Sequence, residues 1–174
     1  ERAHPAGRRP TLLPVSTDEH PTPDPDRVIV EVRDGVADVR LNRAEKLNAL
    51  DTRMFASLVA AGDQVAADPT ARVVVLSGEG RSFCAGLDLS SFAAMASPAD
   101  GDGGGGGGGA GSIVDRMPGR PANLFQEAAH VWHALPQPVV AALHGHVLGG
   151  GLQIALGADV RFCAPDATLS VMEM

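Results

Sequence analysis

The spacing of apolar residues predicts a β-hairpin followed by a helix at the start of the patterned part of the chain. Two strand-like runs, residues 27–33 and 36–42, flank Asp34-Gly35, a dipeptide typical of tight hairpin turns. Apolar residues then recur on one helical face after Asp51, a residue type that caps helix N-termini. The residues of this face are Met54, Leu58, Ala61 and Val65.

The rest of the pattern alternates between strands and helices. Long apolar runs indicate buried strands, and apolar residues at a spacing of three or four indicate helices. The further elements are predicted at residues 72–78 (strand), 121–135 (helix), 138–143 (strand), 151–157 (helix), 160–164 (strand) and 168–172 (strand). The resulting order favours an α/β chain with repeated β-β-α character.

Two segments of the chain lack a periodic pattern. Residues 1–26 contain six prolines and few large apolar residues, which predicts a flexible leader. The chain begins with Glu1 rather than Met, so we expect a processed or trimmed N-terminus. Seven consecutive glycines, Gly103–Gly109, lose much backbone entropy on ordering, which predicts a disordered surface loop at about residues 97–118.

Composition excludes several functional classes. The 174 residues are 44% hydrophobic, and 14 basic against 21 acidic residues give a net charge of −7. Scattered basic residues, no Tyr and one Trp offer neither a phosphate-binding face nor a base-stacking platform, so nucleic acid is excluded as a main partner. No apolar run approaches the ~20 residues that span a bilayer, and no signal peptide opens the chain. We therefore predict a cytoplasmic protein without a membrane span.

Cysteine and histidine spacing predicts no metal site. Cys84 and Cys163 lie far apart without a CxxC pair, which favours two buried, reduced thiols. His130 and His133 are three residues apart on a predicted helix, but no third ligand accompanies them.

Two glycine-bearing stretches follow predicted buried strands, at residues 81–89 and 144–156, and each turns through small residues into a predicted helix. Such junctions leave backbone N–H groups unpaired, and two of them aimed at one point form an oxyanion hole. The alternative is that the glycines only allow tight turns and close packing. A P-loop is excluded because Gly151-Leu152, rather than Lys-Ser/Thr, follows the glycine spacing, and the GxSxG motif of serine hydrolases is absent.

Three motifs carry a resemblance to a known family. They are NRAEKLNAL (42–50), SFCAGLDL (82–89) and the whole segment from Pro138 to Met174. In sequence, order and approximate spacing they resemble the crotonase superfamily, the enoyl-CoA hydratase/isomerase family. The resemblance covers about residues 27–174 and is weaker across the glycine run. It implies an α/β core of repeated ββα units wound in a spiral, assembled as a homotrimer or homohexamer when full length.

The resemblance also implies an acyl-CoA thioester as substrate, with coenzyme A as part of that substrate and no separate cofactor. The family pattern assigns the oxyanion hole to the backbone N–H groups of Leu87 and Gly150. It assigns contacts with the acyl-CoA to Lys46, Leu47, Ala49, Ala85, Gly86, Asp88, Leu89 and Gly149. His144 and His146 occupy positions that carry no catalysis in the family, so we interpret them as loop or packing residues.

The acid–base residues implied by the resemblance are Glu173 and Gln153. Hydratases of the family have two glutamates at these positions; here Glu173 matches and Gln153 departs. A glutamine amide can orient water but cannot take its proton, whereas a shift of a double bond needs only one base. Isomerisation is therefore favoured over hydration, with resemblance to the dienoyl-CoA isomerase branch. A hydratase with a weakened acid–base pair and a non-catalytic acyl-CoA-binding subunit are the alternatives.

Family members continue well past the position of Glu173, with helices that cover the pocket and help to form the trimer. We therefore expect this chain to be a truncated product or part of a longer protein, without the C-terminal helical region. Ending at Met174 would leave Glu173 at a fraying terminus, where it is a solvated carboxylate rather than a supported base.

Overall fold

The computed structural model describes residues 21–90 and 115–172. The order of the helices and strands in these residues agrees with the order predicted from the sequence, with one short strand added. The elements are β1 (Val28–Arg33), β2 (Val36–Leu41), a 3-10 helix η1 (Ala44–Lys46), α1 (Thr52–Ala67), β3 (Val73–Gly78), α4 (Leu124–Ala134), β4 (Val139–Leu143), β5 (His146–Leu148), α5 (Gly150–Leu156), β6 (Val160–Cys163) and β7 (Thr168–Ser170).

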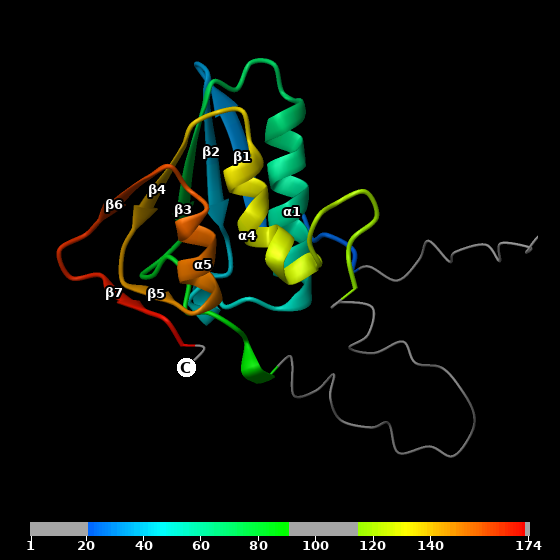
Figure 1. Cartoon of the computed structure of the whole chain (residues 1–174). Coiled ribbons are helices and arrows are strands. Elements are labelled where there is room, and N and C mark those ends of the chain that lie inside the picture. Colours follow the sequence, from blue (N-terminus) through cyan, green and yellow to red (C-terminus); the bar gives the residue numbers. More distant parts are fainter. Residues whose placement is uncertain (1–20, 91–114, 173–174) are drawn as a thin grey trace, which may run out of the picture.

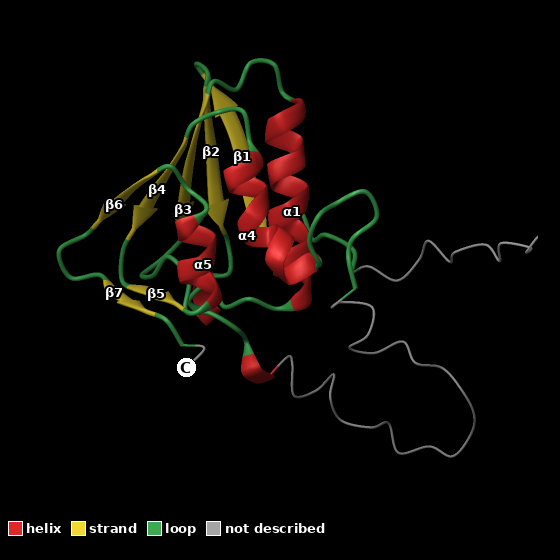
Figure 2. Cartoon of the chain, viewed as in Figure 1, coloured by secondary structure: helices red, strands yellow, loops and turns green. Residues whose placement is uncertain are grey.

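The main sheet has five strands in the order β1-β2-β3-β4-β6 (Figure 2). β1 and β2 are antiparallel, and the other neighbouring pairs are parallel. Strands β5 and β7 form a separate parallel pair. The predicted α/β architecture is therefore confirmed, with a hairpin at one edge of a mostly parallel sheet.

The hairpin and the first helix form for local reasons. Asp34 and Gly35 both have positive φ (51° and 85°), as a type I′ turn requires, and the turn pairs Arg33 with Val36. The Asp51 side chain accepts a hydrogen bond of 2.8 Å from the Met54 N–H at the start of α1, so the predicted N-cap is confirmed.

The core lies between the sheet and helices α1, α4 and α5, which run along one face of the sheet (Figure 1). In β2, the buried residues Ala37, Val39 and Leu41 alternate with the partly exposed Asp38 and Arg40. The predicted face of α1 is buried throughout, and Trp132 of α4 is 1% exposed. One side of the sheet is thus a continuous apolar core.

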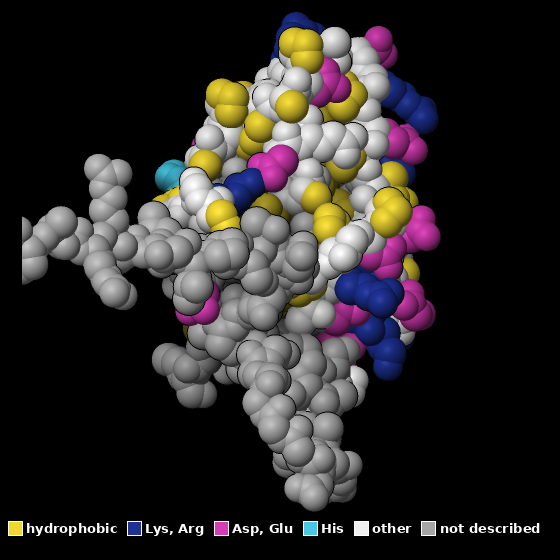
Figure 3. All heavy atoms as spheres, turned by 90° about the vertical axis from the view of Figure 1, so that its right-hand side faces the viewer, with side chains coloured by type: hydrophobic (Ala, Val, Ile, Leu, Met, Phe, Trp, Pro, Cys, Tyr) yellow, Lys and Arg dark blue, Asp and Glu magenta, His cyan; other side chains and the backbone are white. Residues whose placement is uncertain are grey.

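The other side of the hairpin is charged. Arg40 lies 2.7 Å from Glu79 and 3.4 Å from Glu31, and it also pairs with Asp38. Such exposed pairs contribute little stability each. Figure 3 shows acidic and basic side chains interspersed along another face of the molecule, so charges of one sign do not gather on that face.

Strand β5 was not predicted. It has three residues, too few for a period-two pattern, and it is specified by parallel pairing with β7 much later in the chain. His146 pairs with Thr168, and Leu148 pairs with Ser170. Only the tertiary structure brings these partners together.

The structure describes parts of the predicted leader and of the predicted glycine-rich loop. Of the predicted leader, residues 21–26 are described: the Asp24 N–H donates to Ser57 Oγ, and the Ser57 hydroxyl donates to the Asp24 carbonyl, both at 2.9 Å. Of the predicted glycine-rich loop, residues 115–118 are described, and the Met117 N–H donates to the Ala122 carbonyl at 3.0 Å. Residues 1–20 and 97–114 of these predictions lie outside the described residues.

Candidate functional site

The first glycine loop forms an extended strip between Leu50 and β5. On one side, the Cys84 N–H donates to the His146 carbonyl, and the Leu148 N–H donates to the Cys84 carbonyl, both at 3.0 Å. On the other, Leu50 N–H donates to the Gly86 carbonyl at 2.8 Å, and Asp88 N–H donates to the Leu50 carbonyl at 2.9 Å. This pairing leaves the Leu87 N–H without a hydrogen-bond partner among the described residues.

The second glycine loop leads into α5. Gly149 has φ 48° and ψ −120°, and its N–H donates to the Ser170 carbonyl at 2.9 Å. Gly150 is the first residue of α5, where backbone N–H groups have no partner within the helix. Within the parts of the chain that the structure describes, the Gly150 N–H is likewise unpaired.

The two loops meet at a pair of cavities. A cavity of about 230 Å³, called the apolar cavity below, is lined by Phe55, Leu87, Phe125, Ala129, Gly150, Gln153 and Ile154. A second cavity of about 250 Å³ is lined by Ala85, Gly86, Leu87, Leu89, Gly149, Gly150 and Met172. Leu87 and Gly150 line both, so the two unpaired N–H groups belong to residues at the boundary between the cavities.

Glycine is required where the loops pack against each other. Gly86 has φ +87°, and a Cβ there would lie 2.9 Å from the Leu148 carbonyl oxygen. A Cβ on Gly151 would lie 2.7 Å from the Cys84 carbonyl oxygen. The loops therefore approach at backbone distance, which a side chain would prevent.

The segment after β2 reaches the same region. The Ala85 N–H donates to the Leu47 carbonyl at 2.9 Å, so the first two sequence motifs touch through their backbones. Lys46 is exposed on this segment. Lys46, Leu47 and Ala49 do not line either of the two cavities described above. Seven of the predicted residues that the structure describes line one or both cavities: Ala85, Gly86, Leu87, Leu89, Gly149, Gly150 and Gln153. Asp88 lines neither.

Asn48 holds the two motifs together and was missed as a functional-site residue. It is fully buried and has φ 56°. Its side-chain oxygen accepts from the Arg43 N–H at 2.8 Å, and its Nδ2 donates toward the carbonyls of Glu79, Ser82 and Phe83 at 2.8–3.1 Å. The available signal was an amide side chain between Leu47 and Ala49, inside a motif that was already singled out.

Asp88 belongs to a buried ion-pair network. Its carboxylate is 2.8 Å from the guanidinium of Arg43, which is 3.6 Å from Asp51, and Asp51 is 2.9 Å from Arg27. Asp88, Arg43 and Asp51 are each 8% exposed. The network links the end of the first glycine loop to the N-cap of α1, so Asp88 has a clear structural partner.

The histidines near the loops make packing contacts. His146 Nδ1 lies 3.1 Å from Ser82 Oγ, and His144 Nε2 lies 3.1 Å from the Gly80 carbonyl oxygen. The His146 contact joins the two glycine loops, and the His144 contact joins the second loop to Gly80, directly before the first loop. Residues 21–90 and 115–172 contain no group of three or more side chains that could hold a metal ion.

The cysteines differ from each other. Cys84 is buried, and burial raises the pKa of its thiol to about 12. Cys163 is exposed on β6, so the prediction of two buried thiols is wrong for this residue. Its strand lies at the edge of the main sheet, where one side of the strand has no neighbouring strand among the described elements.

Glu173, the predicted base, lies outside the described residues. The described chain ends at Met172, which lines the second cavity together with Leu87 and Gly150. The residue directly before Glu173 is therefore beside the glycine backbone.

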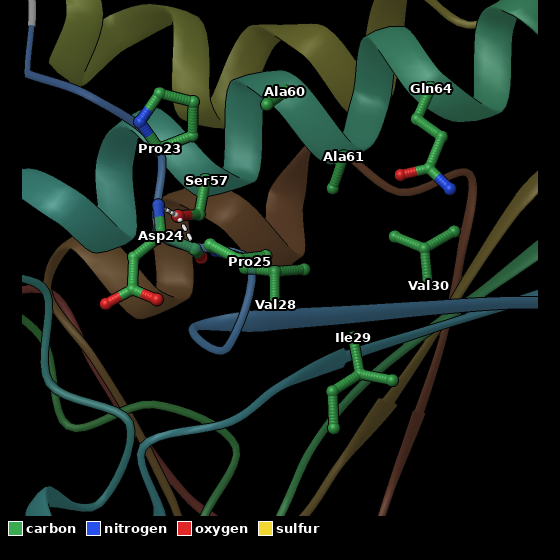
Figure 4. Close-up of a pocket in the computed structure, with 10 residues that line it drawn as sticks. All are labelled: Pro23, Asp24, Pro25, Val28, Ile29, Val30, Ser57, Ala60, Ala61 and Gln64. Atoms are coloured by element: carbon green, nitrogen blue, oxygen red, sulfur yellow. Dashed lines mark hydrogen bonds between the residues drawn. The ribbon is translucent and has the colours of Figure 1, made fainter.

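A larger cavity of about 480 Å³ lies away from the glycine loops, between the segment 21–26, β1 and α1 (Figure 4). Val28 and Val30 point toward α1, and Ile29 points away from it. No residue of either glycine loop is among the residues that line this cavity. Its size alone does not make it the functional site.

The family model for enoyl-CoA hydratase/isomerase matches residues 36–174. The chain belongs to the enoyl-CoA hydratase/isomerase family, and its fold is of the crotonase type. No helix among the described residues is both long and apolar enough to cross a membrane.

Among curated relatives, the human mitochondrial Delta(3,5)-Delta(2,4)-dienoyl-CoA isomerase is 33% identical over 140 residues, 80% of this chain and 40% of the relative. The (E)-benzylidenesuccinyl-CoA hydratase of Thauera aromatica is 34% identical over 148 residues, 84% of this chain and 50% of the relative. The chain therefore spans about half or less of the length of these relatives.

Solved structures give the same result. An enoyl-CoA hydratase from Mycobacterium tuberculosis matches with a TM-score of 0.64 and 32% identity, over 85% of this chain and 50% of that one. An enoyl-CoA hydratase/carnithine racemase from Magnetospirillum magneticum matches with a TM-score of 0.68 and 28% identity, over 84% and 49%.

Proposed function

We propose that this chain forms the thioester-binding part of an acyl-CoA enzyme of the hydratase/isomerase type. The N–H groups of Leu87 and Gly150 donate to the thioester carbonyl oxygen and stabilise the enolate that forms when a neighbouring carbon loses a proton. The observation that carries this proposal is that two unpaired backbone N–H groups, from loops far apart in the sequence, belong to residues lining one cavity.

In this proposal, Glu173 moves the proton and Gln153 orients the substrate or a water. Gln153 lines the apolar cavity with Leu87 and Gly150, and its amide cannot act as a base. A double-bond shift needs one group that removes a proton and returns it to another carbon, which Glu173 supplies. Isomerisation is therefore favoured over hydration with a weakened acid–base pair, and a non-catalytic acyl-CoA-binding subunit is the remaining alternative.

The CoA portion is proposed to lie along the segment of Lys46, Leu47 and Ala49 and the neighbouring loop from Ala85 to Leu89. The hydrogen bond from Ala85 N–H to the Leu47 carbonyl supports a single continuous surface there. Coenzyme A enters as part of the substrate. Gly86 and Gly149 keep the wall of the second cavity bare, so the thioester can approach the backbone.

The assembly and location of the full-length protein are also proposals. We expect a homotrimer or homohexamer, measured by size-exclusion chromatography with light scattering on the natural gene product. A monomer of full length would contradict this expectation. A cytoplasmic location stays a prediction, since relatives named mitochondrial and peroxisomal occur in the family.

The deciding experiment compares Gly150→Pro with Gly150→Ala. Proline removes the N–H at a helix position where it is well tolerated, whereas alanine keeps the N–H. The alanine Cβ would meet only the end of the flexible Leu50 side chain, at 2.8 Å. The measurement is the infrared carbonyl stretch of a ¹³C-labelled acyl-CoA bound to each variant.

We expect the bound carbonyl stretch to shift to lower frequency in the parent and in Gly150→Ala, and to lose most of that shift in Gly150→Pro. Removal of one such donor typically lowers kcat about 10²–10³-fold. An unchanged shift in Gly150→Pro would exclude this N–H as a ligand. In the active protein, Glu173→Gln distinguishes the classes: an enzyme loses turnover but still binds acyl-CoA, whereas a binding subunit never turns over.

A further inference from the structure

The apolar cavity carries information about the acyl group, on the assumption that the proposed function holds. Apart from Leu87, Gly150 and Gln153, its lining consists of Phe55, Phe125, Ala129 and Ile154. These side chains have no hydrogen-bonding groups, and among the described residues of the lining Gln153 alone has a polar side chain. The cavity therefore suits a hydrocarbon group next to the thioester rather than a polar one.

Burial differs among the side chains that line the cavity. Leu87 is 47% exposed, whereas Phe55 is 4% and Ile154 is 1% exposed. The wall formed by Phe55 and Ile154 thus lies in the protein core, whereas Leu87 is exposed and Phe125 and Ala129 are partly exposed. An acyl group that enters beside the unpaired N–H groups extends toward Phe55.

The buried wall includes one ring of an aromatic pair, because Phe55 packs against the partly exposed Phe125. The rings of Phe55 and Phe125 are edge to face, with centroids 4.8 Å apart and an interplanar angle of 84°. Phe55 lies in the first turns of α1 and Phe125 in the first turn of α4, so the pair joins the two helices. Such pairs have a preferred geometry that opposes separation.

Both helix starts are held in place. The Asp51 N-cap of α1 is paired with Arg27 at 2.9 Å, and Asn123 and Gln126 form a capping box around the start of α4. The floor of the cavity is therefore anchored from two sides. A longer acyl chain would have to displace anchored side chains rather than a mobile loop end.

We propose that the Phe55–Phe125 pair limits the acyl group to a short, apolar one, and that Phe55 sets this limit. The cavity of about 230 Å³ equals roughly eight times the ~30 Å³ that one liquid water occupies, which corresponds to about eight non-hydrogen atoms. Butyryl and hexanoyl groups fit this volume, an octanoyl group about fills it, and dodecanoyl or hexadecanoyl groups exceed it. Phe55 is a specificity-determining residue in this proposal.

The test measures the affinity of the chain for butyryl-, hexanoyl-, octanoyl-, dodecanoyl- and hexadecanoyl-CoA by calorimetry. These saturated thioesters bind without turnover. We expect the affinity to peak at hexanoyl- or octanoyl-CoA and to fall by about tenfold or more at dodecanoyl-CoA. In Phe55→Leu and Phe55→Ala, the peak moves to longer chains because the floor recedes.

The matched control is Leu58→Ala. Leu58 lies on the same helix as Phe55 and is fully buried, but it does not line the apolar cavity. We expect it to lower stability without changing the order of affinities. Phe55→Leu removes less volume than Phe55→Ala, so it keeps the test valid if the alanine variant fails to fold.

The outcomes separate this inference from the function on which it rests. Absence of binding for every thioester, butyryl-CoA included, overturns the proposed function and the inference with it. Binding that does not depend on chain length, or a profile unchanged in Phe55→Leu, overturns the inference alone. A shift of the peak in Phe55→Leu but not in Leu58→Ala supports it.

Discussion

The two glycine loops of this protein have the same surroundings in the sequence but are held in different ways. The loop after β3 is braced by side chains from elsewhere: Asn48 binds the carbonyls of Ser82 and Phe83, and Arg43 pairs with Asp88. The loop after β4 is held mainly by backbone hydrogen bonds and close packing of bare glycines, with further contacts from His144 and His146. Buried polar side chains therefore contribute more to the first loop, and close glycine packing contributes more to the second.

The difference predicts which substitutions each loop tolerates. In the second loop, an added methyl group is expected to be the most damaging change. The first loop should be sensitive to an added methyl group at Gly86 and also to the loss of a supporting polar side chain.

Gly145→Ala is expected to lower the free energy of unfolding by about 3–4 kcal/mol, because overpacking adds to the cost of a left-handed residue. Gly145 has φ +56°, and a Cβ would lie 2.1 Å from the Arg81 carbonyl oxygen. The matched control is Gly119→Ala, with φ +73° and nothing within 4 Å of the new Cβ. Denaturant unfolding of both variants measures the difference, and equal losses would show that packing between the loops is not the cause.

Asn48→Ala is expected to lower the free energy of unfolding by about 2–3 kcal/mol, since buried carbonyls lose their donor. The same variant should weaken acyl-CoA binding, because the backbone hydrogen bond between Ala85 and Leu47 then joins the two segments without the Asn48 amide. Asn42→Ala serves as the control. Asn42 makes one exposed hydrogen bond, of 2.9 Å to the Asp26 carbonyl, and its loss should cost less than about 0.5 kcal/mol. A small effect at Asn48 would mean that the first loop is held by other contacts.

Cys84 predicts a dependence of stability on alkaline pH. Burial raises the pKa of its thiol from 9.0 to about 12, so the unfolded chain releases the proton first. The stability contributed by the protonated thiol is fully present below pH 9 and is lost as the pH rises toward 12. At pH 10 the loss amounts to about 1 kcal/mol.

The measurement is unfolding at pH 8 and pH 10 for the parent, Cys84→Ala and Cys163→Ser. Cys84→Ala should lack this part of the alkaline loss, whereas Cys163→Ser should keep it. Thiol labelling of the folded chain should modify the exposed Cys163 much faster than the buried Cys84. Rapid labelling of Cys84 at neutral pH would contradict its burial.

Local interactions explain which elements could be predicted from the sequence. The Asp34-Gly35 turn, the Asp51 cap and the buried face of α1 each depend on residues within a few positions of one another. Strand β5, the exposure of Cys163 and the contacts of Asn48 depend on partners much farther along the chain. No local pattern encodes those partners.

The candidate site divides in the same way. Glycines after buried strands indicated the two loops, and the family motifs assigned Leu87 and Gly150 as donors. Only the structure showed that both residues line one cavity, that Gln153 joins them, and that Phe55 and Phe125 pack together in its lining.

The sequence by itself determined the α/β order, the family and the bare backbone of the two loops, because turns, caps and apolar periodicity act over short distances. The tertiary structure decided which unpaired N–H groups share a cavity and how far that cavity extends. Those properties depend on the packing of α1 and α4 against α5 and the loops, and packing between distant segments is set by the shape of the whole core.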